Sequence, residues 1–361
     1  MKKKVAIILH GLSSNGVDTM FANLSSNWDT DRFEMYYFLA VNPGAEQFCE
    51  DRVRQNGCHV IHLHDLDGIR RLKWTRTLRS ALKEYGPFDV VHSNLSLLSG
   101  LNLMIARRTG IPVRIAHVHT FPGKAGSMAG RLYGLCMRLL LSLNVTCELA
   151  CSAEAGKAAF GNHVFQVIEN GIELDGFLSA GNRKQDREEK QGKYCFATVG
   201  RISPDKNPGF LLDVFDSIHR KIPDASLTWV GDGPQRGQIE SKAAEAGLQD
   251  AVRFLGVRKD VPQILEQCDY FLFPSIHEGF GNALIEAQAA GLECFASDAV
   301  PGITDCGGVR FLSLALPAET WAEEIVSHIH SGEHMKPELQ KIKRFDIQYM
   351  ADKLMNIYQR Y

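Results

Sequence analysis

Short apolar segments that alternate with helical stretches are the feature that most constrains this chain. In its first half, apolar segments suited to buried strands lie at residues 5–9, 35–40, 59–63, 90–91 and 113–117. Parallel strands that are joined by helices form a sheet covered on both faces. The sequence therefore predicts an α/β, doubly wound domain whose ligands bind beyond the carboxyl ends of the strands.

The same alternation starts again after a polar segment. Residues 179–193 read SAGNRKQDREEKQGK, which has too few apolar side chains to build a core, so we expect a surface connection near a domain boundary. Further strands are expected at residues 148–152, 164–170, 194–199, 226–230, 252–255, 270–273, 292–295 and 309–312. A chain of 361 residues is long enough for two cores. We therefore expect domains at residues 1–177 and 178–344, followed by a terminal helix at 345–361.

The stretch 274–291, PSIHEGFGNALIEAQAAG, combines a strand end, a glycine loop and a helix start. Gly279 and Gly281 leave backbone N–H groups uncovered, and Asn282 is expected to cap a helix over residues 283–290. The first N–H groups of a helix lack intrahelical partners and attract anions. The stretch therefore predicts an anion site.

Two carboxylates, Glu278 and Glu286, flank this predicted anion site. A carboxylate repels phosphate but accepts strong hydrogen bonds from hydroxyl groups, so sugar hydroxyls are the expected ligands. Taken by itself, the stretch also fits a simpler interpretation, a surface glutamate beside a glycine turn.

Two cations, Arg201 and Lys206, follow the expected strand at residues 194–199. Arginine binds phosphate through two parallel hydrogen bonds, whereas lysine acts as a point charge. Their position after a strand predicts that both lie over one pocket.

The pair Glu278 and Glu286, preceded by Pro-Ser and followed by Ala287 and Gly291, resembles the signature of the retaining GT-B glycosyltransferases of family-4 type. This resemblance implies two Rossmann-like domains that face a cleft, with the terminal helix at 345–361 returning to the first domain. It implies metal-independent transfer of a sugar, with retention, from a UDP-sugar to a hydroxyl acceptor in cell-surface polysaccharide or lipid-linked glycan synthesis. No cofactor is expected beyond the nucleotide-sugar donor.

The resemblance also implies residue roles. Arg201 and Lys206 would neutralise the donor diphosphate, Glu286 would hold the ribose, and Glu278 would orient the sugar. His119, the second histidine of RIAHVHT, would contact the sugar near the leaving phosphate. The other donor-binding positions that the resemblance implies are Gly16, Val257, Arg258, Gly279, Phe280, Gly281, Asn282 and Ala283.

Some positions depart from the family pattern or remain open. Asn15 stands where a second glycine is usual, and Glu293 stands where proline is usual. His92 is a second candidate on the acceptor side. The simpler interpretation of His92 and of His119 is a side chain at the end of a strand that hydrogen-bonds to backbone groups.

Two other functions are compatible with these motifs. A GT-B type sugar-nucleotide epimerase would release a modified sugar nucleotide without an acceptor. A non-catalytic sugar-binding protein would not need Arg201 and Lys206, and it would normally carry an export signal, for which residues 5–9 are too short. A nicotinamide dehydrogenase is disfavoured because no GxGxxG follows the first strand.

Charge and cysteine content limit the partners and the compartment. The net charge of −2 creates no global field that would recruit nucleic acid. The nine cysteines include no Cys-x-x-Cys pair, which indicates reduced thiols and a cytoplasmic protein. The histidines and aspartates of residues 59–67, including Asp67, invite a metal test, but a half-exposed strand and a solvated loop are the favoured interpretation.

Residues 126–145 are strongly apolar but are interrupted by Arg131 and Arg138. Its apolar run, LYGLCMRLLLSLNV at residues 132–145, is too short to span a bilayer, which takes about 20 residues. We expect a core helix of the first domain. A second interpretation places its basic side, with Arg107, Arg108 and Lys124, on the cytoplasmic face of an anionic membrane, where a lipid-linked acceptor would be found.

Overall fold

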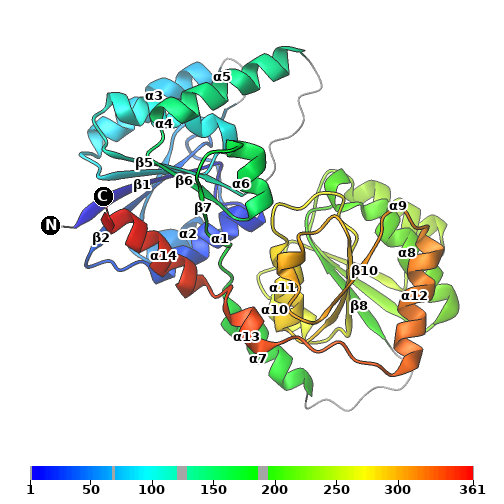
Figure 1. Cartoon of the computed structure of the whole chain (residues 1–361). Coiled ribbons are helices and arrows are strands. Elements are labelled where there is room, and N and C mark those ends of the chain that lie inside the picture. Colours follow the sequence, from blue (N-terminus) through cyan, green and yellow to red (C-terminus); the bar gives the residue numbers. More distant parts are fainter. Residues whose placement is uncertain (1, 67–69, 120–127, 186–193, 361) are drawn as a thin grey trace. The chain divides into compact units, whose positions relative to one another are not determined.

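The computed structural model describes residues 2–66, 70–119, 128–185 and 194–360. The chain divides into two compact units: residues 1–171 with 347–361, and residues 172–346. Each unit contains one parallel sheet with helices packed on it (Figure 1). The α/β, doubly wound class that the alternation of segments predicts is therefore confirmed in both units.

The first unit is built on a seven-stranded sheet of order β3-β2-β1-β4-β5-β6-β7. Its strands are β1 Lys3–Leu9, β2 Phe33–Leu39, β3 His59–His62, β4 Val90–Ser93, β5 Val113–Val118, β6 Cys147–Ala150 and β7 Gln166–Val167. Its helices are α1 Gly16–Leu24, α2 Glu50–Gln55, α3 Arg70–Glu84, α4 Ser99–Arg108, α5 Met128–Asn144, α6 Ala153–Phe160 and α14 Ile347–Arg360, with short 3-10 turns at Ser25–Asn27 and Ser96–Leu98.

Alternate residues of β1 enter different cores. Val5 and Ile7 pack in a cluster with the apolar stripe of α14, whereas Ala6 and Ile8 pack in a cluster with residues of α3 and α4. This follows from the two-residue period of a strand, which sends successive side chains to opposite faces. Because both faces are covered there, the strand is apolar and buried from Val5 to Leu9.

The second unit is built on a six-stranded sheet of order β10-β9-β8-β11-β12-β13. Its strands are β8 Cys195–Val199, β9 Ser226–Val230, β10 Val252–Gly256, β11 Tyr270–Phe273, β12 Glu293–Ser297 and β13 Val309–Leu312. Its helices are α7 Leu174–Gln185, α8 Pro208–Lys221, α9 Arg236–Glu245, α10 Val261–Leu265, α11 Asn282–Ala289, α12 Ala318–Ser331 and α13 Leu339–Lys343, with 3-10 turns at Pro204–Lys206 and Gly302–Thr304.

The division between the units differs from the expected boundaries at 177/178 and 344/345. It falls at 171/172 and 346/347, because α7 packs against α10 and α11 of the second unit. Residues 179–185, expected to be a surface connection, form the end of α7, where Ala180 is fully buried. Residues 186–193 lie outside the described part of the chain.

Two expected elements of the first unit also differ. The strand expected at 164–170 is reduced to the two residues of β7, and Val164 is 95% exposed. The segment expected as a core helix forms α5, which turns only one face inward through Met137 and Leu141. The expected helix of the first unit is therefore confirmed, but it enters the core with one face only, because the opposite face is exposed.

Candidate active site

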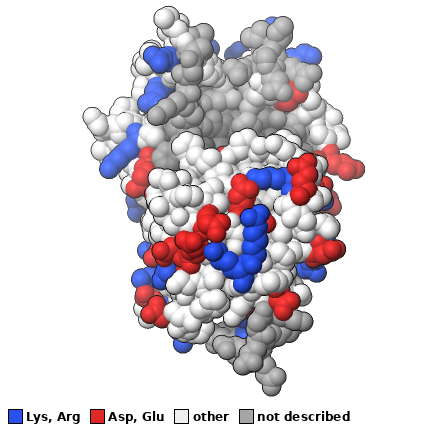
Figure 2. Space-filling view, turned by 90° about the vertical axis from the view of Figure 1, so that its right-hand side faces the viewer, with Lys and Arg blue, Asp and Glu red and all other residues white. Residues whose placement is uncertain are grey.

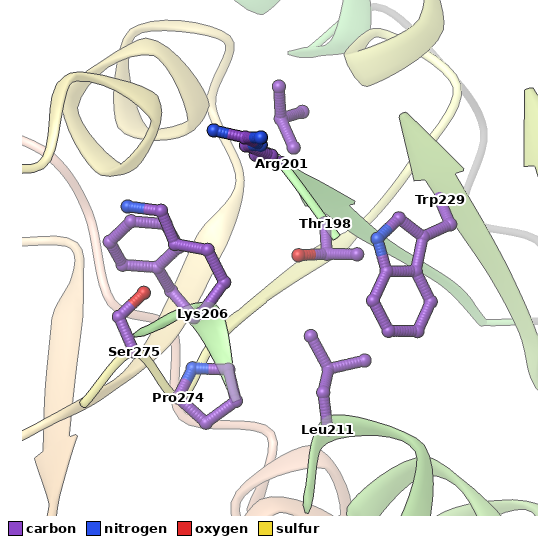
Figure 3. A pocket seen from close by; sticks show the side chains of 10 residues that line it. Thr198, Arg201, Lys206, Leu211, Trp229, Pro274 and Ser275 are labelled. Atoms are coloured by element: carbon purple, nitrogen blue, oxygen red, sulfur yellow. The ribbon is translucent and has the colours of Figure 1, made fainter. Parts of the chain in front are cut away.

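A pocket lies at the carboxyl ends of β8 and β11 in the second unit (Figure 3). The sheet order reverses between these two strands, because β9 follows β8 on one side while β11 lies on the other. In doubly wound sheets such a switch point leaves a crevice that binds ligands. The pocket is lined by Thr198, Val199, Gly200, Arg201, Lys206, Leu211, Trp229, Phe273, Pro274 and Ser275.

Arg201 and Lys206 both line this pocket, as their spacing predicts. Lys206 lies near Ser275 on one side of the pocket, and Trp229 lies on the other (Figure 3). Among the described residues, the Arg201 guanidinium has no hydrogen-bond or ion-pair partner, and it is exposed. The pocket therefore offers two cationic groups to an anion.

The loop that carries Arg201 is packed against a second glycine loop. Gly231 has a φ of +135°, and a Cβ built there would lie 1.9 Å from the backbone oxygen of Gly200. The Ile202 N–H donates to the backbone oxygen of Asp232 at 3.0 Å. Glycine at 231 is therefore required for this close approach, which fixes the backbone beside Arg201.

Lys206 and Glu278 join the two loops that follow β8 and β11. The Lys206 Nζ lies 2.5 Å from Oε1 of Glu278, and the Ser275 hydroxyl donates to the same oxygen at 2.9 Å. The Ile276 N–H also donates to the backbone oxygen of Asp205 at 2.8 Å. The position of the lysine is therefore set by Glu278, which lies 72 positions away in the sequence.

Helix α11 begins beside this ion pair, but its cap differs from the expected one. The N-cap residue is Gly281, with φ 100° and ψ 47°, and Asn282 is the first helical residue. A side chain at 281 would be strained in this left-handed conformation, so glycine ends the loop and starts the helix there. The expectation that Asn282 caps the helix is therefore wrong.

Glu286 lies in α11 and is half-buried. Burial raises the pKa of its carboxyl from 4.5 to about 7. The carboxyl group of Glu286 has no hydrogen-bond partner in the described part of the chain. A carboxyl group with these properties is well suited to accept hydrogen bonds from ligand hydroxyls.

Gln288, one helical turn from Leu284 in α11, was not singled out from the sequence. Its amide nitrogen donates to the backbone oxygens of Leu284 and Thr304, and its amide oxygen accepts from the Cys306 N–H at 2.8 Å. Gln288 therefore holds α11 against the segment before β13. The only signal in the sequence was a polar glutamine among the mostly apolar residues of an expected helix.

The remaining donor-binding candidates of the second unit lie outside the pocket lining. Arg258 donates to both carboxylate oxygens of Asp260 at 2.7 and 2.6 Å, and Val257 is 41% exposed. The Phe280 ring is buried and packs edge-on against Phe345 at 5.6 Å. Phe280 therefore stabilises the fold through its ring. Gly279 and Ala283 belong to the loop and the first turn around the α11 cap.

In the first unit, His119 follows β5 and is 6% exposed. Its Nδ1 lies 3.1 Å from Oδ1 of Asn170, and its Nε2 lies 3.0 Å from Oδ1 of Asn94. Burial lowers the pKa of His119 to about 4, so the ring is neutral at pH 7. Neither asparagine was singled out from the sequence, although Asn94 directly follows a strand.

His92, the second histidine candidate, has no exposed surface. Its Nδ1 lies 2.7 Å from the hydroxyl of Tyr358 in α14, and its Nε2 lies 3.2 Å from Nδ1 of His117. A fully enclosed ring cannot contact an acceptor, so the assignment of His92 to the acceptor side is wrong. Its role is to connect the sheet to the C-terminal helix.

Gly16 is the first residue of α1, which starts beyond the end of β1. Asn15, the departure from the family pattern, caps this helix by accepting from the Asp18 N–H at 3.0 Å. The Asp18 carboxylate in turn accepts from the Ser13 N–H and hydroxyl, and burial raises its pKa to about 6. Asn15 thus acts as a helix cap at this position.

The histidines of β3 are occupied by contacts with neighbouring side chains. His59 stacks on Tyr36, and His62 Nε2 lies 2.7 Å from Oε2 of Glu50. Within the described ranges, no group of three or more His, Cys, Asp or Glu residues could hold a metal ion. Asp67 lies outside those ranges.

Basic and acidic side chains are interspersed on the face seen in Figure 2, and no large region of one sign is visible there. Ion pairs of this kind include Lys221 with Glu319 at 3.2 Å and Lys242 with Asp213 at 2.6 Å.

Comparisons with known proteins agree with this arrangement. Residues 180–342 match the family model described as glycosyl transferases group 1, and residues 15–162 match the glycosyl transferase 4-like domain. The putative glycosyltransferase EpsF of Bacillus subtilis (strain 168) is 30% identical over 375 aligned residues, covering 99% of this chain and 96% of EpsF.

Two further proteins are similar. A protein of Escherichia coli named UDP-Gal:alpha-D-GlcNAc-diphosphoundecaprenol alpha-1,3-galactosyltransferase is 28% identical to this chain. The match covers 64% of this chain and 62% of the E. coli protein. The crystal structure of Anabaena Alr3699/HepE in complex with UDP-glucose matches with a TM-score of 0.79 and 17% identity, covering 99% of this chain and 100% of that one. The structural match supports the two-domain α/β fold.

Proposed function

Because this chain belongs to the group 1 glycosyltransferases, we propose that it transfers a hexose from a UDP-sugar to a hydroxyl group of a growing glycan. The choice of UDP is supported by the UDP-glucose complex of HepE and by the UDP-Gal in the name of the E. coli relative. The same name includes a diphosphoundecaprenol acceptor. We propose a cell-surface polysaccharide or a lipid-linked glycan as the acceptor.

The observation that carries the proposal is the pair of cations, Arg201 and Lys206, in one pocket at the β8–β11 switch point. A diphosphate that leaves the sugar gains negative charge in the transition state. Preorganised positive groups at that position stabilise the transition state more than the ground state. The two side chains would therefore drive departure of UDP, and we propose that they do so without a metal ion.

Two carboxyl groups would bind hydroxyls of the donor. Glu278 is held by Lys206 and Ser275, so its position is fixed before a donor arrives. We assign the sugar hydroxyls to Glu278 and the ribose hydroxyls to Glu286. The start of α11, capped by Gly281, would place backbone N–H groups of residues 279–283 near the diphosphate.

We propose that the reaction retains the anomeric configuration. The acceptor oxygen bonds to the anomeric carbon on the face from which the diphosphate departs, as the bond to the phosphate oxygen breaks. The acceptor proton passes to that phosphate oxygen, so atoms and charge balance. His119 is neutral at pH 7, and as a positioning group for the sugar it would add no charge beside the cationic ring.

Location and membrane contact are further proposals. No helix within the described ranges is long and apolar enough to cross a bilayer. We propose that the protein acts in the cytoplasm, where nucleotide sugars are available, with acceptors presented at the membrane surface.

The first experiment is a thermal-shift series with UDP, UDP-sugars and other nucleoside diphosphates, with and without EDTA. A ligand at about 100 times its dissociation constant should stabilise the folded protein by roughly 2.7 kcal/mol. We expect a shift with uridine nucleotides that persists in EDTA. A shift abolished by EDTA would contradict metal independence, and no shift with any nucleotide would favour a sugar-binding protein.

The stereochemistry and the reaction type need a second measurement. NMR of the product's anomeric proton should show the configuration of the donor sugar, and an inverted product would contradict retention. An altered sugar nucleotide formed without an acceptor would instead identify an epimerase.

A further inference from the structure

One face of α5 carries an apolar stripe that the rest of the described structure leaves exposed. Leu132, Leu135, Leu139 and Leu143 are 63, 65, 60 and 59% exposed, and Met128 is 87% exposed. At about 100° per residue, these five side chains fall within an arc of about 80° on the helix. Soluble monomers rarely expose contiguous apolar surface of this kind without a function.

The stripe cannot turn inward, because the opposite face of α5 is fixed. A Cβ built at Gly100 of α4 would lie 2.6 Å from the backbone oxygen of Met137, so the two helices meet at backbone distance. The guanidiniums of Arg107 and Arg114 donate to the last-turn backbone oxygens of Leu143 and Asn144. The orientation of the exposed face is therefore a property of the fold.

The charges of α5 indicate the chemistry of its partner. Arg131 and Arg138 are seven residues apart, so they lie about 20° apart along one edge of the stripe. Tyr133 lies beyond the other edge, and α5 contains no aspartate or glutamate. Leucines between basic residues and an aromatic residue are typical of a helix that lies in the interface of a membrane with anionic lipids.

We propose that α5 docks the first unit on an anionic bilayer, with its leucines in the acyl boundary and Arg131 at the lipid phosphates. Arg138 lies on the same edge, where its guanidinium donates to the Ala158 backbone oxygen at 3.0 Å and adds positive charge from a fixed position. A helix of 17 residues is about 25 Å long, which suits an orientation parallel to the membrane plane. The proposal concerns a surface of the first unit and does not depend on the chemistry at the donor pocket.

The test is co-sedimentation of the full chain with vesicles of phosphatidylglycerol and phosphatidylcholine, and with vesicles of phosphatidylcholine alone. We expect binding to the anionic vesicles that weakens with salt. Leu139→Glu, at the centre of the stripe, should reduce binding by at least about tenfold. The matched control is Val164→Glu, which places the same charge at an apolar position of the first unit that is 95% exposed.

The charge contribution is tested separately. Arg131→Gln should weaken binding to anionic vesicles several-fold, whereas Arg253→Gln, at an exposed arginine of β10, should not. Thermal melting identifies any variant that fails to fold, and Leu135→Gln then replaces Leu139→Glu. The proposal is overturned if the wild-type chain ignores anionic vesicles, or if Val164→Glu weakens binding as much as Leu139→Glu does. A wild-type dimer that Leu139→Glu dissociates, without vesicle binding, would identify a second copy of the chain as the partner instead.

Discussion

Lys206 and Glu278 form an ion pair of 2.5 Å between the loops that follow two adjacent strands, β8 and β11. The pair lies beside the pocket that Arg201 lines. In the proposed reaction the lysine acts on the diphosphate and the glutamate on the sugar, so the two roles can be separated by mutation.

Glu278→Gln should slow sugar transfer about 10- to 100-fold, because an amide accepts weaker hydrogen bonds from sugar hydroxyls than a carboxylate does. Binding of UDP should be unchanged or tighter, since Lys206 loses its anionic partner and keeps its charge for phosphate. Isothermal titration with UDP and initial rates of transfer measure the two effects. Loss of UDP binding in parallel with turnover would contradict the division of roles.

Arg201→Ala should lower kcat/KM by roughly 100-fold or more, equivalent to about 3 kcal/mol of transition-state stabilisation. The guanidinium is exposed and has no partner in the described structure, so its removal should leave the melting temperature unchanged. Arg253→Ala, at another exposed arginine of the same unit, is the matched control. Steady-state kinetics within about threefold of wild type would exclude the proposed role.

Glu286 should make donor binding depend on pH. Its pKa of about 7 means that the carboxyl is largely protonated at pH 6 and ionised at pH 8. The ionised form is the better acceptor for ribose hydroxyls. Affinity for UDP-glucose, whose diphosphate does not titrate near pH 7, should therefore rise from pH 6 to pH 8 and then level off.

The same carboxyl should lower the stability of the folded protein as the pH rises, whereas it should raise the affinity for the donor. Because folding raises its pKa from 4.5 to about 7, the folded protein retains a proton that the unfolded chain releases between these values. The contribution of this proton to the free energy of unfolding is fully present below pH 4.5 and is lost as the pH rises through 7. For a partly exposed group the loss is about 2 kcal/mol. Glu286→Gln should therefore melt at a higher temperature than wild type at pH 8 and should remove the pH dependence of affinity. Equal pH profiles for the two proteins would contradict the assignment.

Tyr358→Phe should destabilise the first unit by about 1–2 kcal/mol, because it removes the partner of the fully buried His92 Nδ1. Tyr349→Phe is a suitable control on the same helix, since Tyr349 is 61% exposed. Urea unfolding of the full chain measures both. Similar losses for the two variants would show that the hydrogen bond to His92 contributes little.

Gly100→Ala should destabilise the packing of α4 on α5 by about 1–3 kcal/mol, because the added methyl group would meet the Met137 backbone oxygen at 2.6 Å. Gly134→Ala on α5 meets nothing within 4 Å and should be neutral or stabilising, because alanine favours helices over glycine. Thermal melting compares the two glycines directly. A stable Gly100→Ala variant would mean that the helices separate without cost.

Strands and helices were predicted correctly where the local sequence pattern was sufficient. The apolar segment of β11 and the glycine loop after it predicted a strand, a turn and a helix in the correct order. Asn282 was misassigned as the cap because asparagine is a common N-cap residue, whereas the left-handed backbone at Gly281 makes that glycine the N-cap residue. Likewise, nothing local distinguishes the inner face of α5 from its outer face, since both carry leucine.

The sequence by itself determined the α/β class, the existence of two units and the candidate residues of the donor pocket, because strand and helix periods and glycine turns are local properties. Tertiary structure alone decided that His92 is enclosed by Tyr358, 266 positions away, and that Lys206 pairs with Glu278. It also decided that the leucines of α5 remain exposed. Burial and pairing depend on which distant segments share a sheet edge or a helix face, and no local pattern encodes that arrangement.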